Sequence, residues 1–169
     1  MPKILSLLVR NHPGVLSHIA GLFTRRGYNI ESIAAGETAT PNTTRITIVV
    51  GEDESMIERV SKQIRKLIDV IKVQELTYEG SITRELLLLT LLVPVNKRSE
   101  VITITNTFGA TVVDISDKTM TIEISGNSLK INTTIRALGE YKIKELARTG
   151  MVALPLESML DHPKKNTRD

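Results

Sequence analysis

Residues 4–27 read ILSLLVRNHPGVLSHIAGLFTRRG, and this stretch decides the fold of the first half of the chain. It opens on a short apolar run that ends at Arg10, and Pro13 and Gly14 follow, which predicts a strand running into a turn. The apolar residues beyond the turn repeat with helical spacing: Val15, Leu16, Ile19, Ala20, Leu22 and Phe23. Pro13 suits the first turn of a helix, and Gly27 suits its end. The stretch therefore predicts a strand, a turn and an amphipathic helix.

The pattern continues outward to about residue 80. Residues 28–37 and 45–50 are expected to be strands, the second of them half-buried with Thr47 facing outward. Ser55 and Glu58 form a possible capping box for a helix whose apolar positions continue to Ile68. Glu58 and Lys62 are spaced to form an i,i+4 ion pair on the solvent-facing side of this helix. With a further strand over 70–78, the order is βαββαβ, which is that of a ferredoxin-like unit.

The second half repeats this order without obvious sequence similarity to the first. Residues 85–95 suit a strand, and Ser99 is expected to cap a helix closed by Gly109. Residues 112–116 and 120–125 suit a hairpin, residues 129–138 a helix, and residues 141–147 and 151–154 extended segments. The predicted fold class is α+β, with two ferredoxin-like βαββαβ units in series. We expect one domain over 1–79, a second over 80–158, and a disordered tail over 159–169.

Composition excludes most catalytic chemistry. The 169 residues contain no Cys and three His, so disulfides, thiol nucleophiles and thiolate metal sites are ruled out and a histidine metal cluster is disfavoured. No nucleophile, acid–base pair or metal constellation stands out, so we expect neither a catalytic residue nor a metal site. Lys and Arg number 22 against 19 Asp and Glu, and much of the excess lies in the last eight residues. Such a balance, with 3% aromatic residues, argues against a nucleic-acid partner.

The longest apolar run, residues 86–95, contains Thr90 and Pro94. It is too short to span a membrane, which takes about 20 residues. The N-terminus shows no cleavable leader pattern. We therefore expect no membrane association and a cytoplasmic location.

Residues 11–16, Asn-His-Pro-Gly-Val-Leu, form the strongest candidate site. Backbone N–H groups at a helix start, with the positive end of the helix dipole, suit a small anion such as a carboxylate. Gly14 lets a ligand approach the backbone, and Asn11 offers both a donor and acceptors, as an α-amino acid requires. The alternative is a plain strand-to-helix turn in which Asn11 caps the helix.

Asn29, at the start of the next strand, is a second candidate. Its ordinary interpretation is a turn residue. An open four-stranded sheet leaves unpaired edges, however, and joining two sheets across a two-fold axis removes them. We therefore expect a homodimer, in which Asn29 of one subunit can complete the pocket begun by Asn11 of the other.

Several blocks in this order resemble the regulatory small subunit of acetohydroxyacid synthase, also called acetolactate synthase. They are residues 11–16, 21–23, 26–32 and 45–48, which are similar to that family's ACT domain, and residues 84–86, Asp114 and residues 145–150, which are similar to its C-terminal domain. The resemblance extends to about Ser158. It implies that the first unit is an ACT domain and that the chain itself is not the catalyst.

The resemblance further implies a catalytic large subunit as partner, carrying thiamine diphosphate, magnesium and usually FAD, with no cofactor on this chain. That enzyme joins a two-carbon unit from pyruvate to pyruvate or 2-oxobutyrate, on the way to valine, leucine and isoleucine. The small subunit raises its activity and makes it sensitive to a branched-chain amino acid, most often valine. The implied effector-binding residues are Asn11, His12, Pro13, Gly14, Val15 and Leu16 of one subunit, with Asn29 and Ile30 of its neighbour. An ACT-type amino-acid sensor coupled to another enzyme or to a nucleic-acid-binding partner is the alternative.

Overall fold

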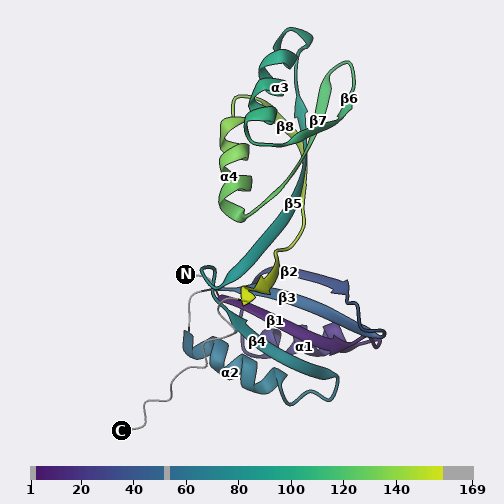
Figure 1. Cartoon of the computed structure of the whole chain (residues 1–169), viewed down its shortest axis with the longest axis vertical. Coiled ribbons are helices and arrows are strands. Elements are labelled where there is room, and N and C mark those ends of the chain that lie inside the picture. Colours follow the sequence, from purple (N-terminus) through teal and green to yellow (C-terminus); the bar gives the residue numbers. More distant parts are fainter. Residues whose placement is uncertain (1–2, 52–53, 158–169) are drawn as a thin grey trace. The chain divides into compact units, whose positions relative to one another are not determined.

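The computed structural model describes residues 3–51 and 54–157 (Figure 1). Their contacts divide into two compact units, one running up to Thr83 and resuming at Met151, the other spanning Arg84–Gly150. Each unit is described by itself below. The tail predicted over 159–169 lies outside the described residues.

The first unit contains the predicted βαββαβ order. Its elements are β1 (Lys3–Arg10), α1 (Val15–Arg25), β2 (Ile30–Glu37), β3 (Thr43–Val50), α2 (Glu54–Ile64) and β4 (Val70–Leu76). The sheet order is β2-β3-β1-β4, and every neighbouring pair is antiparallel. The ferredoxin-like fold predicted for this half is therefore confirmed, and β2 lies at an edge of the sheet.

Both helices pack on one face of this sheet (Figure 1). Val15, Ile19 and Phe23 of α1 are buried there, as the helical spacing predicts. They join residues from β1 and β3, such as Leu7 and Ile48, in one apolar core. Burial of this face supplies most of the driving force for folding the unit.

The opposite face of the sheet is also covered, which the sequence pattern did not indicate. Ile4, Val49 and Leu76 pack against Met151 and Ala153 in a second apolar cluster. The two covering residues lie at the strand β9 (Val152–Pro155), which pairs with β5. The expectation that β3 is half-buried was therefore wrong: Thr47 is only 2% exposed because the face it shares with Val49 is covered as well.

Two further details of α2 differ from the prediction. The helix begins at Glu54, so Ser55 lies inside it rather than at its cap. It ends at Ile64, and Ile68, placed on the helical stripe by its spacing, is 86% exposed. The predicted pair is present, because the Lys62 ammonium donates to the Glu58 carboxylate at 2.6 Å.

The second unit repeats the topology of the first. Its elements are β5 (Ser81–Leu92), the short 3-10 helix η1 (Val95–Lys97), α3 (Arg98–Thr107), β6 (Thr111–Ile115), β7 (Thr119–Gly126), α4 (Ser128–Ala137) and β8 (Lys142–Arg148). The order β6-β7-β5-β8 places these strands as β2-β3-β1-β4 are placed in the first sheet. Two ferredoxin-like units in series are therefore confirmed.

The helix α3 begins without the predicted serine cap. Lys97 occupies the cap position and no side chain caps the helix, while Ser99 lies inside it. Three threonine hydroxyls in α3 donate to the carbonyl oxygen four residues earlier, from Thr103, Thr105 and Thr107. These bonds satisfy the hydroxyls within the helix, which explains how a threonine-rich segment of low helical propensity is accommodated.

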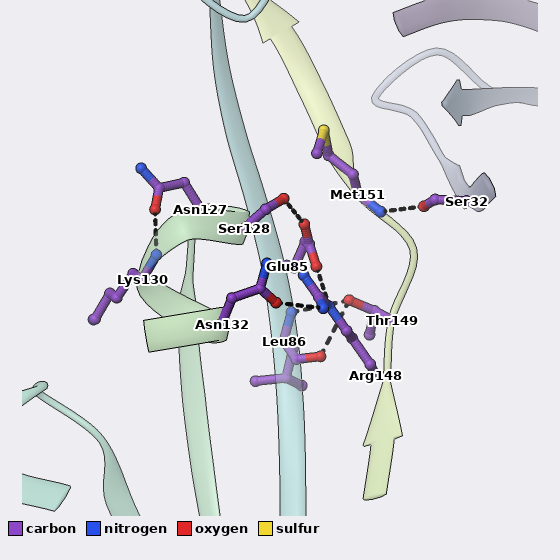
Figure 2. Close-up of polar contacts among 10 residues, drawn as sticks. All are labelled: Ser32, Glu85, Leu86, Asn127, Ser128, Lys130, Asn132, Arg148, Thr149 and Met151. Carbon is purple, nitrogen blue, oxygen red and sulfur yellow. Dashed lines mark hydrogen bonds and ion pairs between the residues drawn. The ribbon is translucent and has the colours of Figure 1, made fainter. Parts of the chain in front are cut away.

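A buried carboxylate connects β5, α4 and the end of β8 (Figure 2). Glu85, 7% exposed, accepts hydrogen bonds from the Ser128 hydroxyl and the Arg148 guanidinium. Arg148 also donates to the side chain of Asn132 at 3.0 Å. The charge of Glu85 is thus paired and hydrogen-bonded, as a buried ion requires.

Candidate functional site

Residues 11–14 form an exposed turn between β1 and α1. The Asn11 N–H donates to the Asn42 carbonyl at 2.9 Å, and the His12 N–H donates to the Arg10 carbonyl at 3.0 Å. Asn42 has a positive φ of 57°, which an asparagine tolerates better than most residues. Backbone bonds thus fix the path of the turn, and the Asn11 side chain remains exposed.

Gly14 occupies the N-cap position of α1 with φ 91° and ψ −16°. A side chain is disfavoured at that φ, so the position favours glycine. No side chain caps the helix, which removes the alternative that Asn11 caps it. The Val15 N–H donates to the His12 carbonyl at 3.4 Å, so the first turn of α1 presents the backbone N–H groups of Leu16 and Ser17, with the positive end of the helix dipole, at an exposed surface.

The space around this helix start is open. A Cβ placed on Gly14 would meet nothing within 4 Å. The Leu16 side chain is 47% exposed beside it, whereas Val15 is 6% exposed and anchors the helix in the core. Val15 and Leu16 are the two apolar residues predicted to contact an effector from this segment. The Leu16 side chain is accessible to a ligand, whereas the Val15 side chain is buried in the core.

The His12 side chain contacts Asp69, a residue outside the turn. Its Nδ1 lies 3.3 Å from an Asp69 carboxylate oxygen, and the Asp69 carbonyl accepts the Arg10 N–H at 2.8 Å. Asp69 thus joins the loop before β4 to the end of β1 and to the turn itself. Sequence reasoning missed Asp69 because nothing in the spacing of residues 10–12 and 69 indicates that they meet.

Asn29 and Ile30 lie at the other end of the same sheet. In the strand register, Arg10 pairs with Thr43 at the beginning of β3, whereas Ile30 pairs with Val50 at its end. The eight residues of β3 span seven steps, so the two ends are about 23 Å apart at 3.3 Å per residue. Within one chain, therefore, the structure brings residues 11–16 together but not Asn29 and Ile30 with them.

Potential metal ligands are not clustered in the part of the chain that the structure describes. No group of three or more His, Cys, Asp or Glu side chains within 3–51 and 54–157 could hold a metal ion. None of the helices in these ranges is long and apolar enough to span a membrane. What the site offers is a set of backbone donors for an anion next to an apolar side chain.

The first unit, with its β2-β3-β1-β4 sheet, is an ACT domain. The model of the "AHAS small subunit-like ACT domain" matches residues 5–72, and that of the "Small subunit of acetolactate synthase" matches residues 84–157. The chain therefore belongs to the family of acetolactate synthase small subunits.

Individual relatives agree with this assignment. The chain is 47% identical over 154 residues to the probable acetolactate synthase small subunit of Archaeoglobus fulgidus, covering 91% of this chain and 96% of that one. It is 44% identical over 154 residues to the acetolactate synthase small subunit of Bacillus subtilis, covering 90% of each. The crystal structure of the small subunit from Thermotoga maritima aligns with a TM-score of 0.86 at 35% identity, covering 92% of this chain and 98% of that one.

Proposed function

We propose that the chain activates the catalytic large subunit of acetolactate synthase and makes it sensitive to feedback inhibition by valine or another branched-chain amino acid. The observation that carries the proposal is the uncapped, exposed start of α1 at Gly14. The effector carboxylate would accept bonds from the N–H groups there, and the exposed Leu16 would contact its aliphatic side chain. Asn11 would provide a further polar contact for the amino acid.

The remaining contacts would come from a second copy of the chain. β2 is an edge strand, and Ile33 on it is 39% exposed. Antiparallel pairing of two β2 edges about a two-fold axis would remove both edges. The same pairing would bring the Asn29 end of one sheet toward the Asn11 end of its neighbour, because the two strands then run in opposite directions. This geometry supports a homodimer with two effector sites shared between subunits.

The catalytic cofactors are assigned to the large subunit. Thiamine diphosphate, magnesium and FAD would be bound there, and pyruvate would be converted there to acetolactate. The small subunit would act through a coupling free energy between its effector site and the large subunit, and about 1–3 kcal/mol is typical of such coupling.

A thermal-shift series tests effector binding directly. L-valine is expected to raise the melting temperature of the isolated chain, because a ligand that binds only the folded state stabilises it. D-valine should do so less, and Asn11→Ala should abolish the shift. Asn106→Ala, at an exposed position of α3, is the matched control and should keep it. No response to L-valine, L-leucine or L-isoleucine would overturn the effector proposal.

Reconstitution tests the regulatory role. Added to its cognate large subunit, the chain is expected to raise the rate of acetolactate formation and to make that rate decline with L-valine. The Asn11→Ala variant should still activate but should lose the valine response. Turnover of pyruvate by the small subunit alone would contradict the proposal.

A further inference from the structure

A pocket of about 410 Å³ lies within the first unit, lined by residues from α1, α2 and the segment after α1. Its apolar lining consists of Leu22, Tyr28 and Val60, of which Val60 is a core residue and the other two pack against that core. The volume is within the range of small-molecule sites. The pocket is thus large enough for a metabolite and has an apolar wall.

The polar lining is almost entirely cationic. Arg25, Arg26, Arg59 and Lys62 border the pocket, and no acidic residue does. The Lys62 ammonium forms an ion pair with the Glu58 carboxylate, with 2.6 Å between Nζ and Oε1. Within the described part of the chain, by contrast, no ion pair or side-chain hydrogen bond involves the three guanidinium groups. The chain as a whole is not strongly basic, since it has 22 Lys and Arg residues against 19 Asp and Glu residues. The overall composition therefore does not explain this cluster of Arg25, Arg26, Arg59 and Lys62.

Helix-end electrostatics explain only part of this cluster. Arg25 and Arg26 lie at the C-terminal end of α1, where cations interact favourably with the helix dipole. Arg59 lies in the middle of α2, away from either helix end. All four cationic residues are exposed to solvent, and Arg59 also interacts electrostatically with the neighbouring Glu58 carboxylate. Helix position therefore does not explain why Arg59 lines this pocket, and its guanidinium group is accessible to an anion that enters it.

We propose that the pocket between α1 and α2 binds a phosphate-bearing small molecule. Guanidinium groups present forked donors that match phosphate oxygens, and the apolar wall of Leu22, Tyr28 and Val60 would contact the organic part of the ligand. Within one chain this pocket lies at the C-terminal end of α1, whereas the proposed effector turn lies at its N-terminal end. The inference does not depend on valine binding.

Two probes separate the contributions of charge and apolar contact. At constant ionic strength, 1-naphthyl phosphate is expected to bind the full-length chain saturably, as followed by its fluorescence and by calorimetry. Inorganic pyrophosphate should displace it, whereas L-valine should not. Binding of pyrophosphate alone as tightly as naphthyl phosphate would indicate a site for inorganic anions and would overturn the organic part of the proposal. Displacement by valine would assign the pocket to the effector site and overturn its separate role.

Substitution locates the binding. Arg59→Gln should weaken naphthyl phosphate at least about tenfold, the effect of losing one hydrogen bond to a charged group. Lys66→Gln removes the same charge from an exposed position that does not line the pocket, and it should leave affinity unchanged. Arg25→Gln serves as a second variant if Arg59→Gln fails to fold. Equal loss in the Lys66 control, or no saturable binding by the unaltered chain, would overturn the proposal.

Discussion

Asn11 and Asn29 lie at opposite ends of one sheet, since the strand that Asn11 follows ends beside Thr43 and the strand that Asn29 precedes begins beside Val50. The two residues therefore cannot line one small pocket within a single chain. If both contact the effector, they must come from different subunits. The proposed sharing of the site between subunits can therefore be tested by mixing variants that each lack one of the two asparagines.

Mixing two inactive variants should restore binding. Asn11→Ala and Asn29→Ala homodimers are each expected to lose valine binding, whereas a mixed dimer has one site in which both asparagines are intact. Random re-assortment about a two-fold axis predicts about one intact site in four. Calorimetric titration of the mixture with valine measures this fraction. Absence of any recovery after verified subunit exchange would contradict a site shared between subunits.

Loss of Arg148 should destabilise the second unit. Arg148→Met leaves the Glu85 carboxylate buried with the Ser128 hydroxyl and without a cation. Breaking a buried pair costs about 3–5 kcal/mol, and the 31% exposure of the Arg148 side chain reduces the expectation to roughly 2 kcal/mol. Urea denaturation measures the change. The double variant Glu85→Leu/Arg148→Met should lose less than the single one, because no buried charge then remains unpaired.

Lys97→Met provides the control for that experiment. Its ammonium lies 2.7 Å from the Glu100 carboxylate, but both side chains are about half exposed. Such surface pairs contribute little, so stability should change far less than in Arg148→Met. A loss equal to that of Arg148→Met would show that burial of Glu85 is not what makes its pair important.

Two glycines of one helix should respond in opposite directions to alanine. Gly14→Ala places a side chain at φ 91°, so stability should fall by about 1–2 kcal/mol although the space is open. Gly21→Ala lies inside α1, where a Cβ meets nothing within 4 Å, and should stabilise by about 1 kcal/mol. Thermal and urea unfolding measure both changes. A stabilising Gly14→Ala would contradict the left-handed conformation of the cap.

The Glu58 carboxylate should titrate below its ordinary pKa. The hydrogen bond from Lys62, and then the charge of Lys62, lowers the pKa of Glu58 in the folded chain. The pair therefore contributes stability above the unfolded pKa and loses it as pH falls through the folded pKa. Carboxyl NMR measures the titration, and Lys62→Gln should raise the pKa of Glu58 toward its ordinary value. An unchanged pKa in that variant would exclude Lys62 as the cause.

Local patterns in the sequence predict most of the elements. Apolar spacing predicts β1 and α1, and the spacing of Val60 and Ile64 predicts the buried side of α2. Glycine and proline mark the turn at residues 13–14. These features succeed because periodicity and turn chemistry act over a few neighbouring residues. The start of α2 was misassigned to Ser55 because a capping pattern can occur inside a helix.

Contacts between distant segments could not be predicted. Thr47 looks solvent-facing by alternation but is buried, and the face of the sheet that it shares with Val49 carries a second apolar cluster with Met151 and Ala153. The contact of His12 with Asp69, and the pairing of Glu85 with Arg148 across 63 positions, arise in the same way.

The sequence by itself determined the two βαββαβ units, the absence of cysteine chemistry and the glycine at the start of α1. Tertiary structure alone decided that this helix start is exposed and uncapped, that Asn29 lies at the far end of the sheet, and that three arginines border one pocket. The physical reason is the distance along the sequence over which each effect acts. Periodicity and turn preferences depend on adjacent residues, whereas burial, strand register and the convergence of charges depend on which distant segments meet when the apolar faces are buried.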